Sequence, residues 1–140
     1  MNKKLLDLML KIKNGDIISS INCDEIDIDE LLDKRDEDPF DSDWVLANEK
    51  MELELANQNL GQATLDFIEQ IREESFKAAN KNLANGEIAE YVSDDFELIA
   101  KSIVIISSDP WVASLLGTYL NGEFPIGLLK NQTVPISDLV

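Results

Sequence analysis

The chain has no histidine and a single cysteine among its 140 residues. Without histidine, Ser-His-Asp and Cys-His catalytic arrangements are excluded, and so are ordinary zinc sites, which need several histidine or cysteine ligands. The one cysteine, Cys23, cannot form an internal disulfide, and its neighbours Asp24 and Glu25 disfavour a reactive thiolate. Covalent and zinc-dependent catalysis therefore have no evident residues to carry them.

Glycine-rich phosphate loops and long hydrophobic runs are also missing. Neither GxxxxGK[ST] nor GxGxxG occurs, and the six glycines stand singly. No apolar stretch approaches the roughly 20 residues that span a bilayer, and the first residues carry Lys11 and Lys13 in place of a small-residue cleavage site. We therefore expect no signal peptide, no transmembrane segment and a cytoplasmic location.

Basic residues are scarce: 12 lysines and arginines face 28 acidic residues, which gives a formal net charge of −16. A field of this sign repels nucleic-acid backbones and anionic lipid, and it attracts basic proteins. The composition therefore predicts a basic protein partner, and it disfavours binding to nucleic acid or to a membrane.

The residues that are present predict a folded, mainly helical protein. Hydrophobic residues make up 44% of the chain, and 140 residues is a common size for one domain, so we expect a single domain over residues 1–140. The predicted fold is mainly α, a bundle of four to five helices with an acidic, loop-rich segment at 16–43, a helical core at 42–122 and a short extended C-terminal piece, with a strand through Ile126, Leu128 and Leu129.

Apolar spacing and capping residues set the expected helices. They cover about 2–14, one turn at about 28–34, 42–60, 62–84, 87–107 and a last helix that begins at Pro110 and ends at Asn121. Asn85-Gly86 is expected to stop a helix, and Asp109-Pro110 to start one. Because residues 103–106 are apolar all round, we expect that end of its helix to be the most deeply buried part of the fold.

The acidic segment carries the most concentrated charge, a net −9 over residues 24–43. One explanation is a solvated, solubilising loop. The other is a docking surface for a basic protein, in which apolar side chains interleaved with carboxylates supply the anchors that charge alone lacks. The predicted partner-binding residues are Asp33, Asp36, Glu37, Asp38, Phe40, Asp41, Asp43 and Trp44.

Charge reversal at Asp36, Asp38, Asp41 and Asp43 is expected to slow association and weaken its salt dependence, and Trp44→Ala to speed dissociation. If neither change affects binding, the interface lies elsewhere. The second-choice surface is the face of the predicted helix at 87–107 that carries Glu90, Asp94, Asp95 and Glu97.

Carboxylates at helical spacing also leave an enzyme alternative. Glu49 and Glu52 stand three apart on one predicted helix, and Glu69 and Glu73 four apart on the next, which could direct them toward Mg²⁺. Glu49-x-x-Glu52 resembles the E-x-x-E half of the signature of the all-helical nucleoside triphosphate pyrophosphohydrolases, whereas the next helix offers Asp66-x-x-Glu69, the reverse of their second half, E-x-x-D. The alternative predicts that the four side chains converge in a cleft.

In overall character, a small, highly acidic, single-domain chain with no active site, the protein resembles the bacterial toxin-immunity proteins of contact-dependent inhibition and colicin-type systems. The resemblance implies an inhibitor, not an enzyme, that needs no cofactor and occludes the active site of a basic toxin domain with nuclease activity. A DNA mimic that blocks a defence enzyme is a further alternative. It requires acids spread along an elongated surface, whereas this chain gathers much of its charge in one segment, so we prefer the immunity hypothesis.

Overall fold

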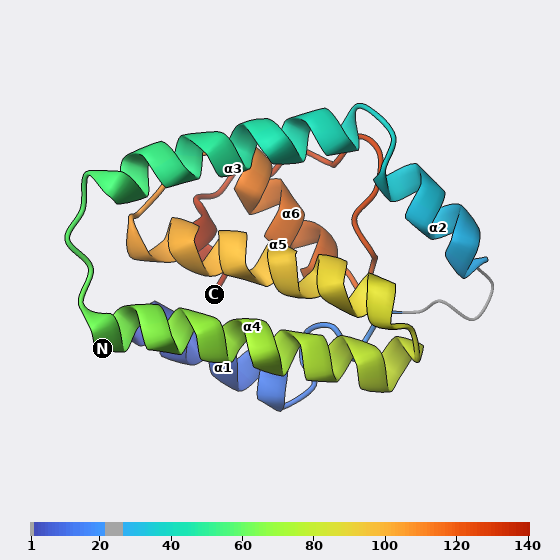
Figure 1. Ribbon diagram of the computed structural model, residues 1–140, viewed down its shortest axis with the longest axis horizontal. Helices are drawn as coiled ribbons and strands as arrows, with labels where there is room; N and C mark the ends of the chain where they lie inside the picture. The colour runs from blue at the N-terminus through green and yellow to red at the C-terminus, as the bar shows by residue number, and fades with distance from the viewer. Residues whose placement is uncertain (1, 22–26) are drawn as a thin grey trace.

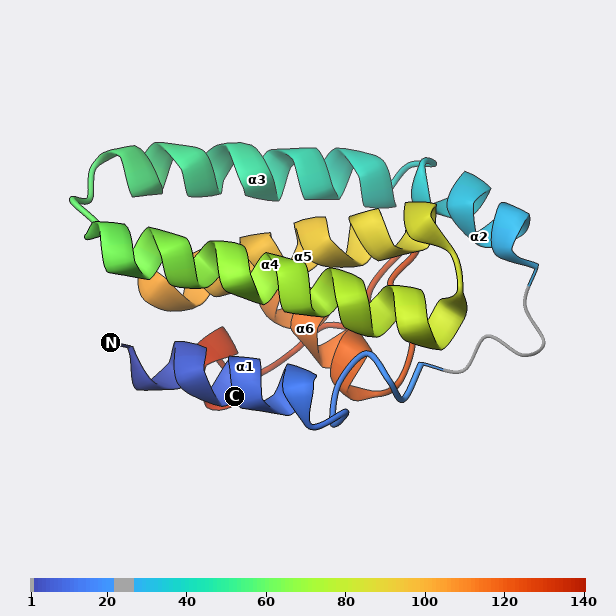
Figure 2. The same ribbon diagram turned by 60° about the horizontal axis from the view of Figure 1, so that its bottom comes forward.

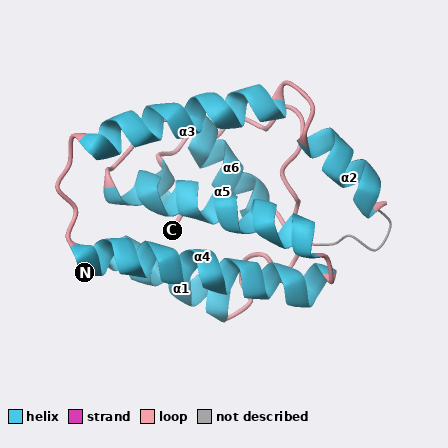
Figure 3. Ribbon diagram, in the orientation of Figure 1, coloured by secondary structure: helices cyan, strands magenta, loops and turns pink. Residues whose placement is uncertain are grey.

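The computed structural model describes residues 2–21 and 27–140, which form α-helices, loops and a C-terminal coil segment (Figures 1 and 3). Within the described residues there are six α-helices, one 3-10 turn and no strand. The elements are α1 (Lys3–Lys13), α2 (Ile28–Arg35), α3 (Phe40–Ala56), α4 (Gln62–Leu83), α5 (Gly86–Val104), α6 (Pro110–Leu120) and η1 (Ile136–Asp138).

The prediction of a mainly α fold is confirmed, but the predicted count of four to five helices is too low. The difference lies in α2, an eight-residue helix where only one turn inside a loop was predicted. Asp27 caps this helix, because its side chain accepts a hydrogen bond of 3.0 Å from the backbone amide of Asp29. Acids in its first turn and Lys34 and Arg35 in its last turn both interact favourably with the helix dipole.

The predictions for Cys23, Asp24 and Glu25 lie outside the described residues.

Helix α5 is the centre of the molecule. It packs antiparallel to α4 and also contacts α1, α3, α6 and η1. Figure 1 shows it between α3 and α4, and Figure 2 shows α3 and α1 on opposite sides of the α4 and α5 layer. Its buried apolar residues recur at helical spacing and include Ile88, Val92, Phe96, Ile99 and Ile103. The central position of α5 decides how the charged residues on its flanks are used.

Two predictions at the ends of α5 are wrong. Asn85 starts α5 instead of stopping α4, because its side chain accepts a hydrogen bond of 3.0 Å from the amide of Ile88, while Ala84 takes the left-handed position after α4. At the other end, α5 stops at Val104. In the turn that follows, Ile106 has a φ of 55° and points to solvent, with 79% of the residue exposed. The deepest burial therefore lies along the middle of α5 and not at residues 103–106.

The C-terminal segment is coil with one 3-10 turn, so the predicted strand through Ile126, Leu128 and Leu129 does not form. Gln132 lies against Gly117 of α6, where an added Cβ would come within 2.8 Å of the Gln132 Cδ. The backbone amide of Gln132 also donates a 3.2 Å hydrogen bond to the hydroxyl of Ser114. Close contact with α6 replaces strand pairing in this segment. The predicted start of α6 is confirmed, since Asp109 accepts a hydrogen bond of 2.9 Å from the amide of Trp111.

Candidate partner-binding surface

The α2 and α3 helices and the link between them carry all six of the predicted partner-binding carboxylates. Asp33, Asp36, Glu37, Asp38 and Asp41 are exposed, and Asp43 is half-buried. In the part of the chain that the structure describes, none of these six side chains takes part in an ion pair. We call these six residues the acidic surface. Their charge is open to a partner because no lysine or arginine of the described chain pairs with it.

Two members of the acidic surface also hold the junction in place. The hydroxyl of Tyr91 on α5 donates a 2.6 Å hydrogen bond to Asp36. Asp38 accepts hydrogen bonds from both the hydroxyl and the backbone amide of Ser42, so it satisfies an amide in the first turn of α3, whose N-cap residue is Pro39. Helix α3 consequently starts at Phe40, two residues earlier than predicted.

Phe40, one of the predicted anchors, lies in the core and not on the surface. Only 1% of it is exposed, and its ring packs 5.4 Å from the ring of Trp111. The Arg35 guanidinium carbon lies 4.2 Å from the centre of the same ring. The earlier start of α3 turns Phe40 inward, because it falls at helical spacing with Ala47 and Met51, the buried residues of that helix.

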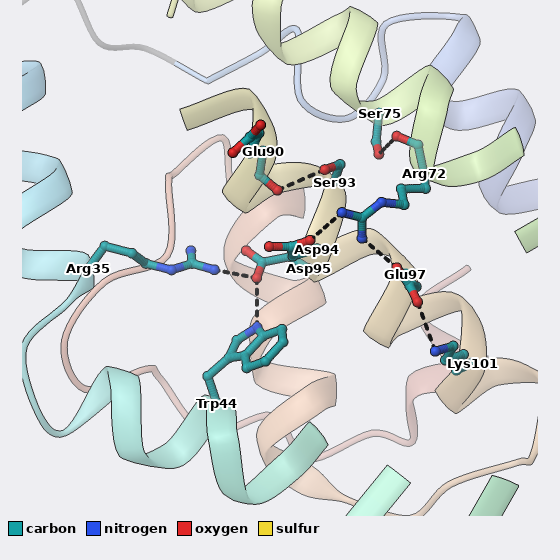
Figure 4. A network of polar contacts seen from close by, with 10 residues as sticks. All are labelled: Arg35, Trp44, Arg72, Ser75, Glu90, Ser93, Asp94, Asp95, Glu97 and Lys101. Carbon is teal, nitrogen blue, oxygen red and sulfur yellow. Dashed lines mark hydrogen bonds and ion pairs between the residues drawn. The ribbon is translucent and has the colours of Figure 1, made fainter. Parts of the chain in front are cut away.

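Trp44, another of the predicted anchors, is half-buried. Its indole N–H donates a 2.9 Å hydrogen bond to Asp95 on α5 (Figure 4). One edge of the ring is therefore fixed by the core. Trp44 packs against that core and also lines the groove described below.

The second-choice surface is divided by the fold. Asp95 is fully buried, Glu90 is exposed, and Asp94 and Glu97 are half-buried. Figure 4 shows Arg72 of α4 between Asp94 and Glu97, with 2.6 Å between the Arg72 Nη2 and the Asp94 Oδ1. Lys101 lies 2.8 Å from Glu97 and 3.1 Å from Glu52. Most of the charge on this face is thus neutralised within the chain.

The pKa values report the same neutralisation. Partial burial alone would raise the pKa of Glu97, but hydrogen bonds and charge from Lys101 and Arg72 outweigh it and lower that pKa below its usual range. Burial opposes the charge of Lys101, yet the hydrogen bonds to Glu97 and Glu52 raise its pKa. At the acidic surface, by contrast, the hydrogen bond to Asp36, with burial, raises the pKa of Tyr91 to about 12. Tyr91 therefore stays a neutral donor to Asp36.

A buried ion pair lies beneath both surfaces. Arg35 of α2 pairs with Asp95 of α5, and the Arg35 Nη1 donates a 3.1 Å hydrogen bond to the carbonyl of Pro125. Asp95 also accepts from Trp44 and, at 2.6 Å, from the hydroxyl of Tyr119 on α6. Burial opposes the charge of Arg35, but Asp95 outweighs it and raises the Arg35 pKa. This centre joins α2, α3, α5, α6 and the C-terminal segment.

The buried pair was not predicted, although the sequence carries a signal for it. Asp95 lies three residues after Val92 and four before Ile99, which is helical spacing within the apolar face of α5. Arg35 likewise lies four residues after the buried Leu31. An acid and a base that each interrupt an apolar face indicate a buried pair, because an unpaired charge is costly to bury.

A groove opens where the acidic surface meets α5. Its volume is about 200 Å³, and it is lined by residues of α2, α3 and α5 and of the short link after α2, namely Arg35, Asp36, Phe40, Asp41, Trp44, Val45, Tyr91 and Asp94. The groove brings Asp36 and Asp41 of the acidic surface together with Asp94 of the second-choice surface. The two predicted surfaces are therefore neighbours on one side of the molecule.

Comparison with known proteins places the chain in a family. A family model described as immunity protein PIM1 matches residues 7–126, which include all of α2 to α6. The chain belongs to the immunity protein PIM1 family. A search of curated proteins gave no match. Family membership confirms that this is a toxin-immunity protein, whose partner is a cognate toxin, and it favours the role of an inhibitor over that of an enzyme.

The carboxylates of the enzyme alternative do not converge in the immunity protein. Glu52 pairs with Lys101, whereas Glu69 and Glu73 line a separate groove with Arg72. Over residues 2–21 and 27–140, no group of three His, Cys, Asp or Glu side chains is arranged to hold a metal ion. The cleft that the hydrolase hypothesis requires is therefore not formed by these residues.

Among the described residues, no helix combines the length and hydrophobicity required to cross a membrane. Exposed apolar side chains on α3, Val45 and Leu46, lie next to the carboxylates at its start in the sequence. The first turns of α3 thus present exposed apolar side chains beside exposed carboxylates.

Proposed function

We propose that this immunity protein neutralises a basic toxin domain with nuclease activity by covering the toxin's active site with the acidic surface. The toxin would belong to a contact-dependent or colicin-type system and would be met in the cytoplasm. The observation that carries the proposal is the set of six carboxylates at the junction of α2 and α3 without an ion-pair partner in the described chain.

Charge complementarity supports the choice of a nuclease. A nuclease active site must attract a phosphate backbone, so it presents positive charge. A protein of net charge −16 whose carboxylates gather at one junction is complementary to such a site. Steering of this kind raises association rate constants to about 10⁸ M⁻¹s⁻¹ at low salt, and rapid capture suits the inhibition of a toxin.

Apolar contacts at the same place support a stable complex and not only a fast encounter. Trp44 is half-buried and Val45 is 44% exposed, and both line the groove between carboxylates. Aromatic residues in partly enclosed positions carry much of the binding free energy in protein interfaces. Exposed carboxylates would set the association rate, and the groove would set the dissociation rate.

The test starts from the reading frame upstream of the gene. The C-terminal domain that it encodes is purified and passed over the immobilised immunity protein at low and at high salt. We expect tight capture that weakens or slows as the salt concentration rises, and loss of nuclease activity in the captured domain. A captured domain that is acidic, or whose binding does not respond to salt, would contradict the proposed surface. A domain without nuclease activity would contradict the proposed target.

A further inference from the structure

The groove at the junction of α2, α3 and α5 has the chemistry of a receptor for one cationic side chain. Three carboxylates line it, from Asp36, Asp41 and Asp94, and its apolar and aromatic lining comes from Phe40, Trp44, Val45 and Tyr91. Arg35 also lines it, but its guanidinium is paired with Asp95 and only 4% of the residue is exposed. Asp94 is likewise paired with Arg72, so the negative charge of the groove comes from Asp36 and Asp41, which have no ion-pair partner in the described chain.

The size of the groove limits what it can hold. Its volume of about 200 Å³ is below the roughly 300–1,000 Å³ of pockets that take small molecules and cofactors. A whole cofactor or nucleotide does not fit a groove this small, and a nucleotide phosphate would be repelled by the carboxylates. A single long side chain from a docked protein matches both the volume and the charge.

We infer that this groove receives an arginine side chain of the toxin, an inference that rests on the proposed function. Arginine suits the lining better than lysine, because its planar guanidinium stacks on aromatic rings and forms paired hydrogen bonds with carboxylates. The chain shows the same chemistry beneath the groove. The Arg35 guanidinium carbon lies 4.2 Å from the centre of the Phe40 ring and 5.1 Å from that of Tyr91, and it pairs with a carboxylate.

The two tryptophans make a direct test possible. Trp44 lines the groove and Trp111 does not, so their indole N–H signals serve as reporter and internal control. The probe is arginine blocked at both ends, titrated into the ¹⁵N-labelled protein up to tens of millimolar, the range expected for one side chain. We expect the Trp44 signal to move while the Trp111 signal stays. Blocked citrulline, which has the same shape without the charge, should leave both in place.

A pair of neighbouring variants links this probe to the toxin. Val45→Arg adds a guanidinium of the protein's own at a residue that lines the groove. Leu46→Arg adds the same charge at an exposed neighbour that does not line it. Val45→Arg should abolish the probe-induced movement of the Trp44 signal and raise the Kd for the captured toxin domain at least tenfold. Leu46→Arg should keep the probe response. Thermal melting of both variants shows that they are folded.

The outcomes separate this inference from the proposed function. No movement of the Trp44 signal at the highest arginine concentration, or an equal response to citrulline, overturns the groove as an arginine receptor even if the toxin binds. A Trp44 response with no basic toxin captured supports the groove and contradicts the proposed nuclease partner. Equal loss of toxin binding in Val45→Arg and Leu46→Arg, with the probe response kept in both, also overturns it.

Discussion

The acidic surface and the acidic face of α5 both carry negative charge, but the acids on α5 are mostly ion-paired within the chain and those of the acidic surface are not. On α5, Asp94 and Glu97 are held by Arg72, Glu97 also by Lys101, and Asp95 by Arg35. At the junction of α2 and α3, six carboxylates have no such partner in the described chain. The difference shows that the acids of a sequence are not equally available. A partner can use only those that the fold leaves without a counter-charge.

The largest difference between the two regions is expected at Asp95, which is buried and pairs with Arg35. We expect Asp95→Asn to lower the free energy of unfolding by about 3–5 kcal/mol, because it leaves Arg35 buried with an uncompensated charge. Chemical denaturation measures the change. The matched control is Asp94→Asn, one residue along the helix, whose ion pair with Arg72 is partly exposed and should contribute less than about 1 kcal/mol. Similar losses in both variants would contradict the division.

A second test moves the charge of the acidic surface itself. Asp36 and Asp38 are hydrogen-bonded to Tyr91 and Ser42, so the cleaner set for reversal to lysine is Asp33, Glu37 and Asp41. We expect this triple variant to reduce the association rate constant for the toxin domain by about tenfold or more at low salt, with a weaker salt dependence. Stopped-flow mixing over a range of salt concentrations gives both quantities.

The control for that reversal changes net charge equally at other places. Asp16, Glu54 and Asp138 are exposed and lie outside the acidic surface. Their reversal to lysine should leave most of the association rate in place, since steering depends on where the charge is and not only on its sum. An equal effect of the two triple variants would mean that net charge alone attracts the toxin.

The smallest expected effect is a pH dependence from the neutralised face. The pKa of Glu97 is lowered in the folded protein, so the folded state binds its proton less readily than the unfolded state. The resulting stabilisation is present above the unfolded pKa of about 4.3 and is lost as the pH falls through the folded pKa. Glu97→Gln should flatten this part of the stability profile. Glu90→Gln, at an exposed site on the same helix, should change the profile less than Glu97→Gln does.

Local rules predicted most of the helices. Apolar spacing located each of the six segments, and Asp109-Pro110 marked the start of α6 as expected. The errors fall where tertiary contact decides between local options. Asn85 can follow one helix or cap the next, and the hydrogen bond to Ile88 settles it. The exposure of Ile106 depends on where α5 ends, which an apolar run alone does not fix.

The sequence predicted where the charge of the candidate surface is concentrated, but not how its side chains are arranged in space. Charge density located Asp33 to Asp43, but it could not show that Phe40 would turn into the core or that Trp44 would bond to a residue 51 positions away. The groove joins residues of α2 and α3 to residues of α5. Contacts between elements so distant in sequence are formed by packing, and no local pattern specifies them.

The bond from Arg35 to Asp95 has a consequence for the entropy of binding. Arg35 stands between Asp33 and Glu37 in the sequence, and its side chain is buried. That side chain contacts both Asp95 of α5 and the carbonyl of Pro125. The backbone that bears the neighbouring carboxylates is therefore ordered before any partner arrives. Backbone that is already ordered in the free protein adds no ordering cost when a partner binds. Folding thus prepares the shape that the toxin meets.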